Sequence, residues 1–249
     1  DGVLGFARRA VVDRYLRPEE RGQGLALLRE TCDLLLERTA GDAGSGVRLA
    51  AARGWVECAG AEHVDALREV LARGFDGGPE ADQDLRWRVL TRLRVLDAAE
   101  DAEVEAQAAA DTTGDGPRRG AKARATAPRE RTKAEAWEAM FAGGDAAPSP
   151  AVLRALAEGF WTSGQDELLA PWVAQWADAV VRTSAERGVA VATTLAGYAF
   201  PVAIVSEAML DAVGAALADP TISPALRRSL EDSEDDLRRA LLVRRTFGG

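Results

Sequence analysis

The sequence predicts an all-α protein, and three observations support this fold class. Hydrophobic residues make up 47% of the chain but aromatic residues only 6%, so alanine, leucine and valine fill most of the core. Alanine and leucine have the best helix propensities. Apolar residues also recur at helical spacing, between glycine or proline breakers placed roughly every 15 to 20 residues. No segment shows the regular alternation of a half-buried strand.

The first half of the chain holds six predicted helices. Pro18 and the two glutamates after it open the second helix, because proline and acidic residues suit a first turn. A glycine-rich loop at 41–46 follows the second helix, and Gly74 is predicted to cap the end of the fourth. The predicted helices cover residues 6–16, 18–36, 47–58, 62–73, 84–96 and 101–110.

The most informative run is the fifth of these helices. Asp82 and Asp84 are both suitable N-caps. An apolar face follows at helical spacing: Leu85, Val89, Leu93 and Leu96, with Leu90 beside them. Four arginines flank it: Arg86, Arg88, Arg92 and Arg94. The pattern favours a buried helix with basic shoulders. The alternative is that the arginines and Trp87 line a surface that meets an anionic partner.

The second half is predicted to be helical as well. Residues 118–133 carry seven basic residues and one acid, and we interpret them as two short helices split at Pro128 with a solvated basic face. A polyanion site is the alternative. Ser149 and Pro150 cap a later helix. The remaining predicted helices cover residues 133–141, 150–160, 167–183, 184–200, 206–217 and 225–243.

The short connections predict antiparallel neighbouring helices. We therefore expect a HEAT/armadillo-like antiparallel helical array, shaped as a superhelical bowl. The expected organisation is a single helical-repeat domain over residues 1–249, with a possible subdivision near 143–148. The chain begins with Asp1 rather than Met, which suggests a fragment of a longer polypeptide or a processed protein.

Charge and cysteine content restrict the possible partners and location. The net charge of −9 argues against generic nucleic-acid binding, which needs a basic surface. No run of 18 apolar residues predicts a membrane span, and no signal peptide is visible. Cys32 and Cys58 fit helical core positions as reduced thiols. These features predict a cytoplasmic protein.

A search for catalytic motifs yields none on this chain. His63 is the one histidine, so neither H-E-x-x-H nor a Cys/His metal site can be formed, and we expect no cofactor here. We interpret Glu62 and His63 as a solvated pair at a helix start. Phe160 and Trp161 are adjacent, so they are not expected to face one core together. Trp161 is therefore predicted to be partly exposed or at an interface.

Several blocks of sequence resemble the C-terminal domain of bacterial aminopeptidase N, of the actinobacterial type. The first is residues 82–93 (DQDLRWRVLTRL) and the second is residues 158–172 (EGFWTSGQDELLAPW). Residues 121–137 lie between them as in that family, and residues 224–241 also match. The resemblance covers most of the chain and is weakest over residues 1–45.

The resemblance implies a non-catalytic helical domain of a zinc-dependent aminopeptidase, a gluzincin metallopeptidase. Zinc and the catalytic residues would lie in a separate upstream domain that is missing here. The implied partners are that domain and peptide substrates, with no nucleic acid or membrane. Arg86, Arg88 and Trp161 are the candidate chamber or interface residues. The alternative function is a free-standing helical-repeat scaffold that binds another protein.

Overall fold

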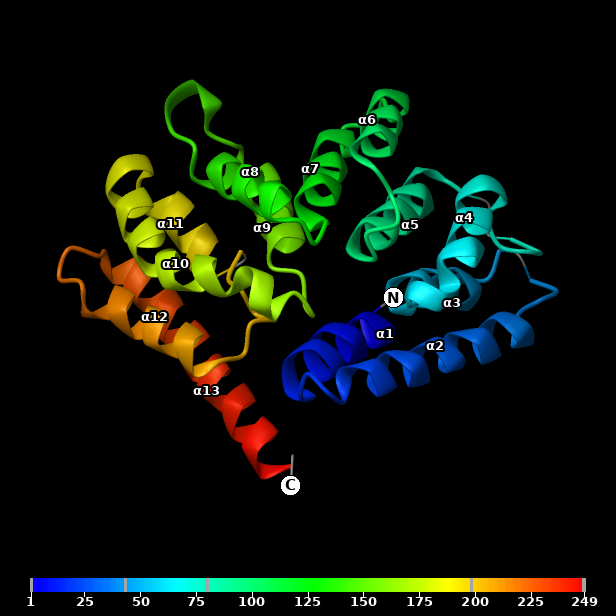
Figure 1. Cartoon of the computed structure of the whole chain (residues 1–249), viewed down its shortest axis with the longest axis horizontal. Helices are drawn as coiled ribbons and strands as arrows, with labels where there is room; N and C mark the ends of the chain where they lie inside the picture. Colours follow the sequence, from blue (N-terminus) through cyan, green and yellow to red (C-terminus); the bar gives the residue numbers. More distant parts are fainter. Residues whose placement is uncertain (1, 43, 79–80, 198, 248–249) are drawn as a thin grey trace. The chain divides into compact units, whose positions relative to one another are not determined.

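The computed structural model describes residues 2–42, 44–78, 81–197 and 199–247. All regular structure in these residues is helical, which confirms the predicted all-α fold (Figure 1). The α-helices are α1 Gly2–Phe6, α2 Arg21–Arg38, α3 Gly46–Cys58, α4 Val64–Arg73, α5 Gln83–Val95, α6 Asp101–Ala110, α7 Gly116–Thr126, α8 Glu130–Phe141, α9 Pro150–Phe160, α10 Asp166–Arg187, α11 Val189–Ala196, α12 Glu207–Ala218 and α13 Pro224–Thr246. The π-helix η1 spans Ala7–Tyr15, and the 3-10 helices are η2 Ala61–His63 and η3 Gly144–Ala146.

The chain divides into two compact units, Asp1–Ala123 and Arg124–Gly249. The boundary lies within α7, some residues before the subdivision predicted near 143–148. That breaker forms the connection between α8 and α9 and contains η3. The HEAT/armadillo-like array and its bowl shape stay predictions.

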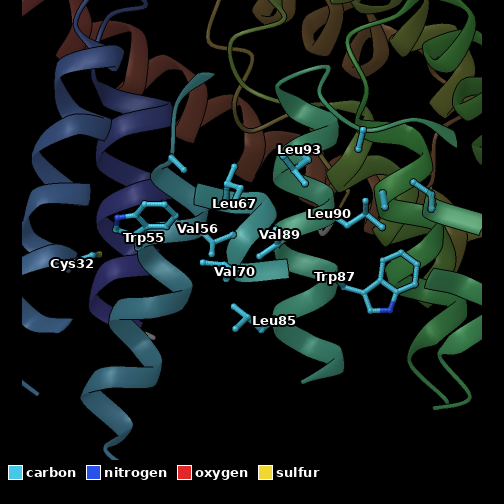
Figure 2. Close-up of a cluster of buried hydrophobic side chains, with 14 of the residues drawn as sticks. Cys32, Trp55, Val56, Leu67, Val70, Leu85, Trp87, Val89, Leu90 and Leu93 are labelled. Carbon is cyan, nitrogen blue, oxygen red and sulfur yellow. The ribbon is translucent and has the colours of Figure 1, made fainter. Parts of the chain in front are cut away.

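The first unit is built around α3 and α5. Helix α3 packs against α2 and α5, and α4 packs against α5. Buried side chains from all four helices meet in one core, including Cys32, Trp55, Leu67, Val89 and Leu93 (Figure 2). A smaller cluster of Val12, Leu25 and Cys58 joins η1 to α2 and α3. The apolar face predicted for residues 85–93 is thus the centre of this unit.

The second unit packs its helices in neighbouring pairs. Helix α8 packs against α9, α10 packs against α11 and α12, and α13 packs against α11 and α12. Serine side chains cap the N-termini of three of its helices. In each, the serine hydroxyl oxygen accepts a hydrogen bond from a backbone N–H three residues later: Ser149 from Val152, Ser206 from Met209 and Ser223 from Leu226. The predicted Ser149–Pro150 helix start is confirmed.

The predicted helices differ from the structure in two regions, residues 6–16 and residues 184–200. Residues 6–16 were expected to form one amphipathic helix, but the chain enters a π-helix, in which the N–H of Leu16 donates to the carbonyl of Val11 at 3.0 Å. The break expected at Ser184 lies at Gly188. Helix α10 continues through Ser184 and ends at Arg187. It stops there because Gly188 has φ of 84°, a backbone conformation that glycine adopts without steric cost.

None of the helices in the described part of the chain is both long and apolar enough to cross a membrane.

Candidate functional site

Helix α5 is fixed at its start by the cap that the sequence predicts. The Asp82 carboxylate accepts a hydrogen bond from the N–H of Leu85 at 2.8 Å. The helix is then buried on most of its circumference, because Trp87, Arg92 and Arg94 are buried together with the apolar face. The interpretation as a buried helix is correct, and the burial extends to the basic residues themselves.

The carboxylate of Asp84 is shared by three arginines from three helices. Its Oδ2 atom lies 2.9 Å from both Arg88 Nε and Arg53 Nη2, and its Oδ1 lies 3.6 Å from Arg119 Nη2. Arg88 also contacts Glu57 on α3. Burial raises the pKa of Asp84, but the bond from Arg88 and the nearby arginine charges outweigh it and hold that pKa below its ordinary value. We call this set of residues the Asp84 network.

Trp87 meets an anion within its own unit. Its indole Nε1 donates to Asp111 Oδ2 at 2.7 Å. The other carboxylate oxygen accepts from the N–H and the hydroxyl of Thr113, at 2.9 and 2.6 Å. These bonds from Thr113, followed by the bond from Trp87, lower the pKa of Asp111. Trp87 and Arg88 thus both bind carboxylates of this chain. The alternative, a surface that meets a separate anionic partner, stays a prediction.

The other arginines of α5 mostly bind backbone carbonyls. Arg86 Nε donates to the carbonyl of Ala81 at 2.9 Å, and Arg92 Nε donates to that of Ala59 at 2.6 Å. Arg94 Nη1 donates to Ala99 at 3.0 Å, and its Nη2 lies 2.6 Å from Asp101. Arg86 and Arg88 are therefore both half-buried with partners inside the first unit.

Trp161 lies in the second unit and is buried, so the prediction that it is partly exposed is wrong. Helix α9 ends at Phe160, and Trp161 leaves it with φ −81° and ψ 52°. This turn lets both adjacent rings enter one aromatic cluster. The Trp161 ring centroid lies 4.6 Å from that of Phe160 and 6.3 Å from that of Trp137.

The most unusual polar group of the second unit is Lys133, which the sequence did not single out. Its side chain is fully buried. Nζ donates to three backbone carbonyls: Ala125 at 2.9 Å, Phe160 at 2.9 Å and Gly159 at 3.3 Å. These carbonyls belong to the last turns of α7 and α9, where helices leave acceptors unsatisfied and carry partial negative charge.

Opposing effects act on the charge of Lys133. Burial lowers its pKa to about 7. Three acceptors call for three donors, however, and only the ammonium form supplies them. The ring of Phe160 adds a contact, with Nζ 5.5 Å from its centroid. The lysine is thus a structural clamp between two helix ends. The sole sequence signal was that it is one of only two lysines in an arginine-rich chain.

The basic segment at 118–133 has both exposed and buried cations: Arg118, Arg124 and Arg131 are exposed, whereas Lys133 is buried. It forms α7 and α8 with a break around Pro128, as predicted. Arg119 joins the Asp84 network, Arg131 pairs with Glu135 at 2.7 Å, and Lys133 is buried. The interpretation of this segment as ordinary helices is confirmed, although one of its charges points inward.

His63 has a structural role in the 3-10 turn η2. Its Nδ1 accepts from the N–H of Gly60 at 3.1 Å, and its ring lies edge-on to Trp55 with centroids 5.7 Å apart. A carboxylate oxygen of Glu62 is also 3.1 Å from Nδ1. Because Nδ1 accepts from Gly60, we assign the neutral tautomer and regard Glu62 as a neighbour rather than a proton-sharing partner. Among the described residues, no group of three or more His, Cys, Asp or Glu is placed to hold a metal ion.

Comparison with known proteins agrees with the resemblance noted in the sequence. Over 245 residues the chain is 34% identical to aminopeptidase N of Streptomyces lividans, and the alignment covers 96% of this chain but 28% of that relative. The chain thus spans little more than a quarter of the relative's length. The model of the ERAP1-like C-terminal domain family matches residues 3–239. Because this match takes in nearly the whole chain and both of its compact units, the chain belongs to the ERAP1-like C-terminal domain family.

Proposed function

We propose that this chain is the substrate-chamber or capping domain of a zinc-dependent aminopeptidase N, which removes N-terminal residues from peptides. The observation that carries the proposal is the 34% identity to an aminopeptidase N across 96% of this chain. That alignment takes up 28% of the relative, so most of a comparable polypeptide would lie outside this sequence. Catalysis belongs to that other part.

The proposed partners are an upstream catalytic domain and peptide substrates. The single histidine and the lack of a suitable donor group among the described residues do not fit a zinc site on this chain. Zinc would therefore be bound by the upstream domain. The helices of the present chain would limit which peptides reach it. A cytoplasmic location stays a prediction that rests on the two reduced cysteines.

Arg86 and Arg88 are the proposed contact residues toward the chamber or the catalytic domain. The Arg88 side chain is 32% exposed although it contacts Asp84 and Glu57. A guanidinium has five N–H donors, so it can hold these partners and still reach a peptide carbonyl or carboxylate. Trp161 is buried, so any role it has at the chamber would be to support the surface from behind rather than to contact a peptide.

A direct test starts with the gene sequence encoding the residues before Asp1. The proposal fails if that sequence lacks H-E-x-x-H followed by a distant glutamate. If the motif is present, the full polypeptide should hydrolyse an aminoacyl reporter, and the 249-residue chain alone should bind no stoichiometric zinc and hydrolyse none.

The proposed contacts can be tested separately. The double variant Arg86→Glu/Arg88→Glu should weaken binding of this chain to the separately expressed catalytic part, or raise KM for longer peptides in the full enzyme. Arg131→Glu is the matched control, because Arg131 is 85% exposed and lies outside the first unit. Unchanged affinity and KM in the double variant would remove Arg86 and Arg88 from the chamber. Binding to an unrelated protein instead would favour the scaffold function.

A further inference from the structure

The first two α-helices of the chain leave four large apolar side chains more than half exposed. On α1, Val3 is 83% exposed and Phe6 64%; on α2, Leu27 is 65% exposed and Leu34 55%. We call these four the N-terminal apolar residues. Helix α1 continues directly into η1, and η1 packs against α2, so both helices belong to one corner of the first unit. Exposed apolar residues scattered singly are normal, but several on adjoining elements mark an interaction surface.

The register of α2 shows that its exposed leucines point away from the core. Leu25 and Cys32 lie seven residues apart and are buried. Leu27 and Leu34 each follow one of them by two residues, which is about 200° further around the helix. On α1, Leu4 packs against the main core of the first unit. Helix α2 is thus apolar on two opposite sides, a pattern typical of a helix with neighbours on both.

The last helix of the chain has the opposite kind of surface. From Arg228 to Arg239, every exposed residue of α13 is charged. Two ion pairs lie along it, Arg238 to Glu234 at 2.8 Å and Arg239 to Asp235 at 2.5 Å. A stack of helices needs a polar outer face where it ends in solvent. Helix α13 has such a face over these residues, whereas α1 and α2 do not.

The comparison with the relative indicates which partner can reach this surface. The chain spans 28% of that aminopeptidase N, and its family is a C-terminal domain. Under the proposed function, most of the polypeptide therefore precedes Asp1. Val3 and Phe6 lie only a few residues after that point. Consecutive helices usually pack together, with connections of roughly 2–8 residues. The segment directly before Asp1 is thus the best-placed partner for α1 and α2.

We propose that the polypeptide segment directly before Asp1 forms one or more further amphipathic helices, which cover the N-terminal apolar residues. The existence of this segment rests on the proposed function, which requires a longer polypeptide. The helical domain would then begin upstream of Asp1, before the catalytic part ends. The covering helix would present leucine, valine or aromatic side chains at helical spacing, because the surface it meets is apolar.

Photocrosslinking in the full polypeptide identifies the covering segment. Benzoylphenylalanine in place of Phe6 should crosslink to the roughly 40 residues before Asp1, about the length of one helix pair in helical repeats, and peptide mass spectrometry locates the crosslink. Crosslinks to a second copy or to a more distant part of the polypeptide, or none at all, would overturn the proposal. The readout needs neither zinc nor activity. A polypeptide without H-E-x-x-H that still gave these crosslinks would refute the proposed function alone.

Thiol labelling measures how well the surface is covered. In the full polypeptide, Val3→Cys and Leu27→Cys should react with a maleimide at least about tenfold more slowly than Asp235→Cys. Asp235 is the matched control, because its side chain is 69% exposed on the charged side of α13. In the 249-residue chain alone, the three introduced thiols should react at similar rates, while protection of the buried Cys32 shows that the chain is folded. Equal rates in the full polypeptide would overturn the proposal.

Discussion

The Asp84 network and the Lys133 clamp both stabilise charged side chains away from bulk water, but with different kinds of partner. In the first unit, three partly exposed arginines surround a carboxylate, so side chains neutralise side chains. In the second unit, the partners of a fully buried ammonium among the described residues are three backbone carbonyls and an aromatic ring. The first arrangement is solvated and adjustable, whereas the second has no alternative partner. We therefore expect the single lysine to matter more for stability than any one arginine.

Replacing Lys133 by alanine is the strongest test of this comparison. Three carbonyls would lose their donor and the missing side chain would leave a cavity, so the free energy of unfolding should fall by about 3–5 kcal/mol. Urea unfolding followed by tryptophan fluorescence measures it, since Trp137 and Trp161 lie in the adjoining aromatic cluster. Arg131→Ala on the same helix is the control and should cost less than about 0.5 kcal/mol. Equal effects of the two variants would contradict the clamp.

The second prediction concerns the buried bond from Trp87 to Asp111. Trp87→Phe keeps most of the ring but removes the N–H donor to a carboxylate, so it should cost about 2 kcal/mol more than Trp55→Phe. Trp55 belongs to the same core cluster, and its indole makes no hydrogen bond to a described residue. Equilibrium unfolding of the two variants gives the difference. Equal losses would mean that only ring packing matters at this position.

The third prediction uses the pH dependence of Lys133. An unfolded lysine keeps its proton to about pH 10.5, but burial lowers the pKa of Lys133 in the fold to about 7. Between these values the unfolded state binds more protons, so stability should rise with pH, by at most about 1.4 kcal/mol per unit. Below pH 7 the contribution is constant. The wild-type curve is compared with that of Lys133→Met, which cannot titrate.

The outcome also shows how strongly the carbonyls hold the proton. A difference between wild type and Lys133→Met that stays flat from pH 7 to 9 would show that the three hydrogen bonds and the two helix ends offset the effect of burial. The lysine would then remain an ammonium throughout, and the clamp would be a permanent charge.

The same comparison explains what the sequence could predict. The Asp82 cap, the apolar face of α5 and the break near Pro128 depend on neighbours within one or two turns, and each was predicted correctly. Glu57, the second partner of Arg88, and Asp111, the partner of Trp87, lie 31 and 24 residues away along the chain, so only the packed structure reveals them. Lys133 was missed because its partners are backbone carbonyls, which every residue type carries. The predicted exposure of Trp161 was wrong, because the change of backbone direction at the end of α9 lets the rings of Phe160 and Trp161 enter the same core.

The smallest expected loss of stability is that of replacing Arg88, and its dependence on salt concentration provides a further test. Arg88→Ala should cost about 1 kcal/mol, because its contacts with Asp84 and Glu57 are partly solvated. A double-mutant cycle with Asp84→Ala isolates the pair and should give a coupling of about 0.5–1 kcal/mol. In 1 M salt this coupling should shrink, since screening acts within a few ångströms there. The loss in Lys133→Ala should not shrink, because no mobile ion reaches a fully buried ammonium. If the Arg88–Asp84 coupling did not change with salt, the Asp84 network would be as shielded from mobile ions as the Lys133 clamp, and the proposed difference between the two would be wrong.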